Sequence, residues 1–410
     1  MKVVLISVGD ELLAGRVVDT HAALASSELH ALGAQVVAHV TVGDPEGALA
    51  EVLRRECARA DVVLVTGGLG PTEDDRTRSE CAQAAGVPLD FHESWWAKIV
   101  ERYRGSPVKL SERNQRQAFF PRGAHGIENP WGTAPAFSLP IGAATVYCLP
   151  GVPHEFRGLL TEVVLPELRG RLPDRSDERV WAFHGVPEST LDAWIVETLE
   201  AAGLPPDHHI CVKEGEIEVR LRGDFDLLPA AREAFGARCL GEGDLRLPAR
   251  VIAEARRSGG TVAVAESCTG GIISSRLTDV PGSSAVLRCA WVPYANEAKI
   301  AELGVDAREI AEHGAVSAPV AEALARGALE RSGARWAVST TGIAGPTGGS
   351  LEKPIGLIWF GVAGPEGVCA GVRRLPGDRN RVRSYGSTQA LACLLAAIRG
   401  EDPFPWAEGP

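Results

Sequence analysis

Short apolar segments alternate with amphipathic ones along the first 170 residues. Residues 3–8, 35–42 and 61–66 are rich in Val, Ile and Leu, which is typical of buried strands. Between the first two, Ala25, Leu29 and Leu32 recur at helical spacing. Strands that alternate with helices predict an α/β domain over residues 1–170, with a parallel sheet covered on both faces. Ligands of such sheets collect at the carboxyl ends of the strands.

The remaining chain predicts a small α+β module over residues 171–244 and a second α/β domain over residues 245–400. The predicted elements are strands at 180–184, 210–212, 217–221, 261–265, 336–340, 355–362 and 367–373, and helices at 44–53, 187–202, 320–328 and around 391–395. The strands 210–212 and 217–221 predict a hairpin, and 173–179 and 241–244 are expected linkers. Residues 401–410 are rich in Pro and acid and are expected to be a loose tail.

Composition narrows the class of protein. The net charge of −11 argues against a duplex-DNA binder, so no nucleic-acid partner is expected. Nine cysteines without a C-x-x-C pair favour reduced thiols in a cytoplasmic protein. No apolar run of about 18 residues occurs, so no membrane partner is expected either. The small module has little core of its own, which predicts packing against a partner subunit in a homodimer.

Ser267 lies where an apolar strand is followed by small residues and two glycines. A helix is expected from Ser267 onward, which resembles the logic of a nucleophile elbow. Free amides at the start of that helix would stabilise an oxyanion. The alternative is that Ser267 merely caps the helix, and the local sequence favours neither interpretation.

A serine nucleophile needs a base, and Lys299 is the candidate. If a helix begins near Ala295, Lys299 can turn back toward the serine while Tyr294 stays close. Burial or a nearby cation must then lower the lysine pKa; the alternative is an ordinary exposed lysine. His313, the only histidine of this block, lies in a polar turn.

A second glycine-rich loop, Thr340–Gly349, follows another predicted strand. Its successive amides can form an anion-binding nest. Arg379, expected just before the last helix, can clamp a phosphate with two hydrogen bonds. Two such loops in one block favour a bound anion over plain turns.

The third block resembles the nicotinamide-nucleotide amidase family. The motifs that carry the resemblance are Ala-Glu-Ser-Cys-Thr-Gly-Gly (265–271), Pro-Gly-Ser-Ser (281–284), Tyr-x-Asn-Glu-x-Lys (294–299), Gly-Ala-Val-Ser (314–317), Gly-Ile-Ala-Gly-Pro-x-Gly-Gly (342–349), Lys-Pro-x-Gly (353–356) and Pro-Gly-Asp-Arg (376–379). The resemblance implies deamidation of nicotinamide mononucleotide to nicotinate mononucleotide and ammonia, without a cofactor. It implies Ser267 as nucleophile and Lys299 as base. Support or substrate binding falls to Tyr294, Thr341, Arg379, Thr269, Gly270, Gly271, Gly342 and Gly345.

In the first block, the loop Thr66–Asp75 joins a strand to a helix. Its glycines Gly67, Gly68 and Gly70 let the backbone approach a phosphate. Asp74 and Asp75 can hold a hard divalent cation. The alternative, which is compatible with function, is that Thr72 caps the helix and the acids stabilise its dipole.

Together with further segments, this loop resembles the molybdopterin-binding-like domain of the competence/damage-inducible CinA family. The further segments are Gly9–Gly15 with Glu11, Asp19-Thr20, Gly132–Pro135 and Leu149–Glu155. The resemblance implies nucleotide binding through Glu11, Thr72 and the glycines. It also implies hydrolysis of ADP-ribose with Mg, Mn or Co, to which Asp19, Asp74 and Asp75 would be ligands. It makes the middle module KH-type, although a Gly-x-x-Gly clamp is missing.

Two residues depart from the family pattern near this site, His21 in place of Asn and Ala136 in place of Gly. Two other functions stay open: handling of a molybdenum cofactor by the first domain, since fold does not decide function, and a non-enzymatic role in competence.

Overall fold

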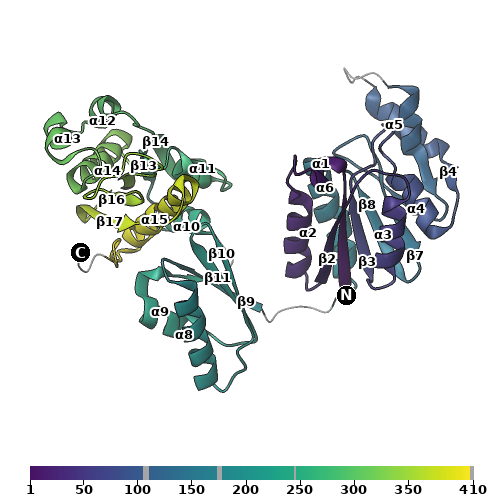
Figure 1. The fold of residues 1–410 in the computed structure, drawn as a ribbon, viewed down its shortest axis with the longest axis horizontal. Coiled ribbons are helices and arrows are strands. Elements are labelled where there is room, and N and C mark those ends of the chain that lie inside the picture. Colours follow the sequence, from purple (N-terminus) through teal and green to yellow (C-terminus); the bar gives the residue numbers. More distant parts are fainter. Residues whose placement is uncertain (105–109, 173–177, 244–245, 407–410) are drawn as a thin grey trace. The chain divides into compact units, whose positions relative to one another are not determined.

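The computed structural model describes residues 1–104, 110–172, 178–243 and 246–406 (Figure 1). The chain forms two compact units, Met1–Ser176 and Asp177–Pro410. The predicted middle module and third domain therefore belong to one unit.

Six strands form the main sheet of the first unit, in the order β2-β1-β3-β8-β7-β6. Strands β2, β1, β3 and β8 are parallel, β7 pairs antiparallel with β8, and β6 pairs antiparallel with β7. Only two residues connect β7 to β8, and so short a connection can only reverse the chain. The elements are β1 Lys2–Val8, α1 Asp10–Leu13, α2 Thr20–Ala31, β2 Gln35–Val42, α3 Ala48–Cys57, β3 Val62–Thr66, α4 Thr77–Ala85, β4 Leu89–Phe91, α5 Glu93–Tyr103, η1 Glu112–Ala118, β5 Phe119–Pro121, β6 His125–Ile127, β7 Ala136–Ile141, β8 Ala144–Leu149, α6 Pro153–Leu159, η2 Leu160–Val164 and α7 Leu165–Arg169.

Helices cover both faces of this sheet, as predicted. Alternate residues of a strand point to opposite faces, so Val4 and Ile6 pack in the core with α3, whereas Val3 and Leu5 pack in the core with α2. Helix α3 begins at Ala48, so the predicted start at residue 44 is wrong. The carboxylate of Glu80 on α4 accepts hydrogen bonds from amides at this start, including that of Ala50 (3.0 Å). A residue from another helix thus supplies the cap.

The second unit begins with a four-stranded antiparallel sheet, β10-β11-β9-β12, on which α8 and α9 pack. The predicted hairpin is confirmed as β10 and β11. Its elements are β9 Glu178–His184, α8 Glu188–Ala201, β10 His208–Lys213, β11 Glu216–Arg222, α9 Leu228–Phe235, η3 Gly236–Arg238 and β12 Cys239–Glu242. The expected linker at 241–244 is wrong for its first two residues, because Gly241 pairs with Ala182 and Glu242 with Trp181. The likeness to a KH-type fold stays a prediction.

A five-stranded sheet, β14-β13-β15-β16-β17, forms the centre of the second unit. Strands β14, β13 and β15 are parallel, β16 pairs antiparallel with β15, and β17 pairs antiparallel with β16. Helix α15 packs on one face and α14 on the other (Figure 1). The elements are α10 Leu247–Arg257, β13 Val262–Glu266, α11 Ile272–Thr278, η4 Ser283–Ala285, β14 Leu287–Trp291, α12 Asn296–Leu303, α13 Ala307–His313, α14 Ala318–Ser332, β15 Trp336–Gly342, β16 Leu357–Gly364, β17 Gly367–Arg374 and α15 Arg379–Arg399.

The small module packs on this larger domain of its own chain. Glu216 on β11 is buried, and its carboxylate accepts hydrogen bonds from the amide of Leu247 (2.9 Å) and from the guanidinium of Arg276 (2.7 Å). The module therefore has a packing partner within the chain, and the homodimer stays a prediction.

The chain end is packed rather than loose as far as Trp406. Phe404 is only 6% exposed and belongs to the core on α15. The ring of Trp406 lies 5.7 Å from that of Phe404 and 6.4 Å from that of Phe360. Residues 407–410 lie outside the described residues, as do 173–177 of the first expected linker, whose last two residues begin β9.

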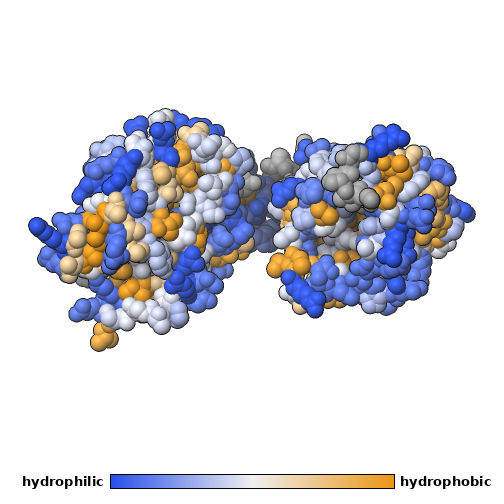
Figure 2. Space-filling model, turned by 90° about the horizontal axis from the view of Figure 1, so that it is seen from above, coloured by the Kyte–Doolittle hydropathy of each residue, from blue (hydrophilic) through white to orange (hydrophobic). Residues whose placement is uncertain are grey.

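The surface drawn in Figure 2 is mostly hydrophilic, with hydrophobic residues scattered among polar ones. Within the described ranges, none of the helices combines the length and the apolar character that crossing a bilayer requires.

Candidate active sites

Ser267 lies directly after β13, which pairs with β14 on one side and with β15 on the other. All residues of β13 are buried, and the amide of Ser267 donates a hydrogen bond to the carbonyl of Thr340 (3.0 Å). The chain then turns through residues 268–271, and helix α11 begins only at Ile272. The prediction of a helix from Ser267 is therefore wrong. The capping alternative is wrong too, because Gly271 occupies the N-cap position.

The carboxylate of Glu266 occupies the start of α11. This side chain is fully buried and accepts hydrogen bonds from the amides of Gly271, Ile273 and Ser274 at 3.0, 3.0 and 2.9 Å. A carboxylate in this place stabilises the positive end of the helix dipole. These amides are therefore not free to bind an oxyanion, contrary to the prediction. The amides of the turn 268–270 are the remaining candidates beside Ser267.

Lys299 lies on α12 and is buried beside the serine turn. Only 2% of Lys299 is exposed, so the exposed-lysine alternative is wrong. Its Nζ donates hydrogen bonds to the carbonyls of Pro293 and Tyr294, both at 3.0 Å. Burial lowers the pKa of Lys299, and a charge interaction with Cys268 opposes this shift. That interaction places the amine close to the residue that follows Ser267.

The two carbonyl contacts leave one position of the Lys299 amine unoccupied. A neutral lysine has two N–H donors and one lone pair, and both donors are occupied by these carbonyls. The lone pair is then left to accept a proton. Among the described residues, no hydrogen bond joins this amine to the hydroxyl of Ser267. Such contacts are often long without substrate.

Cys268 is the other nucleophilic side chain next to Ser267. Its thiol is buried, and burial raises the pKa of Cys268 to about 12. The thiol is therefore protonated at neutral pH, and a protonated thiol is a poor nucleophile. The hydroxyl of Ser267 is the better candidate.

Arg379 joins the glycine-rich loop Thr340–Gly349 to Tyr294. It is the first residue of α15, which Asp378 caps by accepting a hydrogen bond from the amide of Arg381 (2.8 Å), so the expected position before the helix is wrong. Its guanidinium donates to the carbonyl of Gly345 (2.8 Å) and to the phenol oxygen of Tyr294 (3.0 Å). Arg379 and Tyr294 are both exposed, so they lie at the rim of the site.

Two neighbouring threonines of β15 have different contacts. The hydroxyl of Thr341 donates to the carbonyl of Ala315 (2.7 Å) and thus holds the loop before α14. The hydroxyl of Thr340 lies 2.8 Å from that of Thr269, and its carbonyl accepts from Ser267. Thr340, which the sequence analysis did not single out, is therefore the threonine that supports the serine turn. Gly342 packs tightly against β16, a structural role.

Arg383 is a further residue of this site that the sequence analysis missed. It lies one helical turn after Arg379, and its guanidinium donates to the carbonyl of Thr269 (3.0 Å). A Cβ at Gly270, where φ is +62°, would lie 3.1 Å from this guanidinium. The spacing of four residues from Arg379 is the signal that could have found it.

In the first unit, the loop Thr66–Asp75 closes on itself at the carboxyl end of β3. The carbonyl of Gly67 accepts a hydrogen bond from the hydroxyl of Thr77 (2.7 Å). The carboxylate of Asp75 accepts from the amide of Thr72 (2.8 Å) and from its hydroxyl. Helix α4 begins at Thr77, so the alternative in which Thr72 caps it is wrong.

Acidic side chains gather beside this loop. The amide of Asp10 donates to the carboxylate of Asp44 (3.1 Å), and the amide of Asp44 donates to the carboxylate of Asp10 (3.2 Å). The pKa of Asp44 is raised, first by burial and then by the charges of Asp10, Glu11 and Asp74. Glu11 and Asp74 therefore lie in one negative field with this pair.

The three predicted metal ligands are not assembled into one group. Asp19 caps α2 through the amide of Ala22 (2.9 Å) and accepts from the hydroxyl of Ser7 (2.5 Å). Asp75 is bound to Thr72. Over the described ranges, no three His, Cys, Asp or Glu side chains are arranged to hold a metal ion. The residues present therefore do not fit a preformed metal site.

The two departing residues differ in their surroundings. His21 stacks on Phe156, with ring centroids 4.2 Å apart, and a ring nitrogen lies 2.9 Å from the hydroxyl of Thr66. Burial lowers the pKa of His21, while Asp19 opposes this shift. His21 therefore lies at the start of the glycine loop. Ala136 is fully buried on β7.

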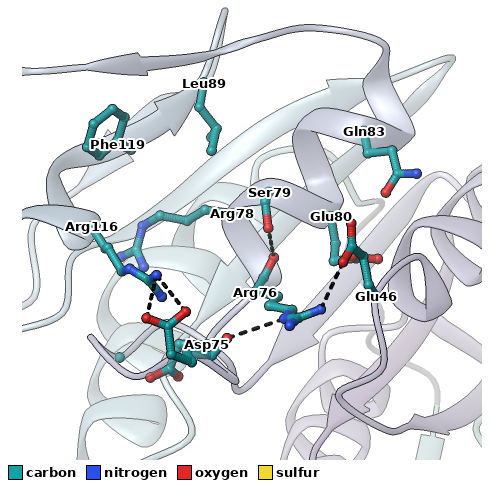
Figure 3. A pocket seen from close by; sticks show the side chains of 12 residues that line it. Glu46, Asp75, Arg76, Arg78, Ser79, Glu80, Gln83, Leu89, Arg116 and Phe119 are labelled. Carbon is teal, nitrogen blue, oxygen red and sulfur yellow. Dashed lines mark hydrogen bonds and ion pairs between the residues drawn. The ribbon is translucent and has the colours of Figure 1, made fainter. Parts of the chain in front are cut away.

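A cavity of about 440 Å³ lies between the glycine–acid loop, α4 and β4–β5 (Figure 3). Gly70 and Asp75 line it together with Arg76, Arg78 and Arg116. Arg78 is buried and donates to two carbonyls, and Arg116 holds Glu73 with two bonds of 2.7 Å. These three arginines, which the sequence analysis missed, can donate to phosphate oxygens, although Arg76 and Arg116 are now paired with Glu46 and Glu73 of the same wall. Arg76 and Arg78 directly follow the acidic segment, and this position could have indicated their place in the cavity. No local sequence pattern indicates the place of Arg116.

The fold and sites define a protein of two α/β units, one with an arginine-lined cavity beside a glycine-rich loop and one with a serine near a buried lysine. The family described as "CinA C-terminal domain" matches residues 244–398, and the family described as "Probable molybdopterin binding domain" matches residues 4–170. A CinA-like protein of Anaeromyxobacter sp. (strain K) is 44% identical over 409 residues, covering 97% of this chain and 100% of the relative. The chain therefore belongs to the CinA family.

Other relatives agree with this assignment. A CinA-like protein of Citrifermentans bemidjiense is 42% identical over 405 residues, covering 96% of this chain and 97% of the relative. Among solved structures, the competence/damage inducible protein CihA of Agrobacterium tumefaciens is 42% identical. It covers 37% of this chain and 93% of its own, with a TM-score of 0.36. The assignment rests on the sequence matches.

Proposed function

We propose that the second unit is an amidase that converts nicotinamide mononucleotide to nicotinate mononucleotide and ammonia. The observation that carries the proposal is the burial of Lys299, with its lowered pKa, beside the turn that begins at Ser267. A buried neutral amine near a serine hydroxyl is what a Ser–Lys hydrolase requires. The match to the CinA C-terminal domain supports the same unit as the active one.

The proposed reaction has two steps. The Oγ of Ser267 attacks the carboxamide carbon while the lone pair of Lys299 takes the hydroxyl proton. The C–N bond then breaks, the lysine returns this proton to the leaving nitrogen, and ammonia departs from an acyl-serine. In the second step water attacks the ester with Lys299 as base, releasing the carboxylic acid and restoring the serine. Amides of the turn 268–270 stabilise the oxyanion of both steps.

Residues at the rim account for the nucleotide part of the substrate. Arg379 is exposed, and its charge meets no carboxylate within hydrogen-bonding reach among the described residues. It is the proposed ligand of the 5′-phosphate, together with the loop from Gly342 to Gly349. Arg383 acts through the turn by holding the carbonyl of Thr269.

The test is ammonia release from nicotinamide mononucleotide by the full chain. Wild type and Ser275→Ala, a change at an exposed serine of α11, are expected to be active. Ser267→Ala is expected to lose about 10³-fold or more in kcat, because the covalent route is closed. Full activity of Ser267→Ala would overturn the mechanism. Absence of ammonia release in the wild type would overturn the substrate.

We infer a second activity for the first unit, the hydrolysis of ADP-ribose to AMP and ribose 5-phosphate. The observation in its favour is the cavity in which three arginines meet the glycine–acid loop. A requirement for Mg, Mn or Co stays part of the prediction. The residues that would bind this metal are not assigned. Hydrolysis is measured with EDTA and with each metal, in wild type, Asp75→Ala and the exposed control Glu162→Gln. Binding of ADP-ribose without turnover under any metal would favour a binding domain, as the molybdenum-cofactor alternative requires.

A further inference from the structure

A second cavity in the second unit has no part in the proposed reactions. It measures about 370 Å³ and lies between the small module and the domain that carries Ser267. This volume is within the roughly 300–1,000 Å³ of small-molecule sites. The lining residues that bear on the argument are His184 and Gly185 of the module, and Arg373, Arg374, Arg381 and Tyr385 of the larger domain.

The charges of this cavity are unbalanced. Arg373, Arg374 and Arg381 line it, and Glu188 is the single carboxylate among its lining residues. Within the described ranges, none of the three arginines forms an ion pair with a carboxylate. Arg373 instead donates to the side-chain oxygen of Gln389 (2.7 Å), and Arg381 lies over the ring of Tyr385, 5.0 Å from its centroid. Cations held together without an anion repel each other, and an anionic ligand relieves this repulsion.

His184 contributes a neutral ring to the wall of this cavity. It ends β9, is only 3% exposed and lines the cavity. Its Nδ1 is buried and has no hydrogen-bond partner among the described residues. Burial, followed by the charge of Arg373, lowers the pKa of His184 to about 4, so the ring is neutral at pH 7. The ring therefore adds no positive charge to that of the three arginines.

The backbone makes room for the guanidinium groups. At Gly185, where φ is +64°, a Cβ would lie 3.0 Å from a terminal nitrogen of Arg373. At Gly215, where φ is +84°, a Cβ would lie 3.5 Å from the ring of Tyr385. Both turns thus bring bare backbone against the cationic wall and leave the cavity open.

We propose that this cavity binds the phosphate group of a small metabolite. Planar guanidinium groups bind phosphate oxygens with paired hydrogen bonds, and a phosphate supplies the missing negative charge. The site is separate from the serine–lysine centre. Residues two apart on a helix face different ways, so α15 presents Arg379 to Gly345, Arg383 to the serine turn and Arg381 to the cavity. The proposal stands whether or not the amidase proposal holds.

The test is calorimetric titration of the full chain with inorganic phosphate, AMP and adenosine. The variant Arg374→Gln/Arg381→Gln changes two exposed residues, and Arg326→Gln on α14 is the exposed control. We expect the double variant to bind one phosphate fewer per chain than the control, or to bind it at least tenfold more weakly. Adenosine, which lacks a phosphate, is expected to bind both proteins equally. The ratio of the affinities for AMP and inorganic phosphate tells whether the ligand is a nucleotide or the free ion.

A site-specific readout accompanies the titration. The ring-nitrogen NMR signals of His184, assigned with His184→Gln, are expected to shift when phosphate is added to the wild type but not to the double variant. Equal phosphate stoichiometry and affinity in double variant and control, with no shift of the His184 signals, would overturn the proposal. Binding of a short RNA that the double variant loses, without binding of phosphate or AMP, would also overturn it in favour of a polymer site.

Discussion

Replacing Lys299 by Met tests the centre of the amidase proposal. Met matches lysine in length and prefers a buried place, so the change removes the amine with little loss of volume. The side chain is only 2% exposed, and its Nζ donates to the carbonyls of Pro293 and Tyr294. The variant therefore loses the proposed base and leaves two carbonyls without their donors.

The expected loss of activity follows from the role of a general base. A positioned base contributes about 10²–10⁴-fold, so kcat/KM is expected to fall by this factor. The loss corresponds to about 3–5 kcal/mol of transition-state stabilisation. The two lost hydrogen bonds lower the free energy of unfolding by about 1–3 kcal/mol at a pH where the amine is neutral. The protein is expected to remain folded, because domains of this size are stabilised by about 5–15 kcal/mol.

The dependence on pH separates the base from a structural lysine. Because burial lowers the pKa of Lys299, kcat/KM of the wild type is expected to rise as the pH passes this lowered pKa and the amine becomes neutral. In the same window, up to the usual value of 10.5, the unfolded chain binds more protons than the folded chain. The free energy of unfolding therefore rises with pH in the wild type. Lys299→Met is expected to lose both slopes.

The assays are ammonia release and urea unfolding, each measured between about pH 6 and 10. Lys213→Met, at an exposed lysine of β10, is the matched control. Activity of Lys299→Met above about a tenth of the wild type, with the pH profile unchanged, would refute the role of Lys299 as base. A loss of activity that tracks a loss of folded protein would instead make it a structural residue.

Three further predictions concern the surroundings of this centre. Glu266→Gln is expected to lower the free energy of unfolding of the second unit by about 2–5 kcal/mol, because an amide group cannot accept from all the amides that the carboxylate now binds; urea unfolding measures it. Arg379→Gln is expected to raise KM for nicotinamide mononucleotide about tenfold with a smaller change in kcat, since the residue lies at the rim. Deleting residues 401–410 is expected to cost about 2–4 kcal/mol, because Phe404 leaves the core; thermal unfolding measures it.

Each of these predictions has a control and a contrary result. Glu330→Gln on α14 is exposed and should leave unfolding unchanged. If Glu266→Gln has the same free energy of unfolding as Glu330→Gln, the carboxylate of Glu266 does not stabilise α11. For the rim, Arg326→Gln should keep the wild-type KM, and an unchanged KM in Arg379→Gln would remove Arg379 as the phosphate ligand. A truncated chain as stable as the full chain would show that Phe404 is not part of the core in solution.

Some contacts that are close along the chain could be predicted, whereas those between distant segments could not. The helix that carries Lys299 begins at Asn296 with Ala295 as N-cap, as the local pattern indicated. The sequence analysis missed that Glu266 caps α11, because a carboxylate inside an apolar strand carries no local signal for a partner. It also misplaced the start of α3, whose cap comes from Glu80, more than thirty residues away.

The sequence by itself determined the α/β class of both large domains, the β10–β11 hairpin, the family and the serine and lysine on which the amidase proposal rests. Periodicity and motif spacing are properties of neighbouring residues, so they can be read before the chain folds. The tertiary structure alone decided that Lys299 is buried with a lowered pKa, that the amides of α11 are occupied, and that arginines line two cavities. Burial, desolvation and charge interactions depend on which distant side chains meet, and only the packed chain brings them together.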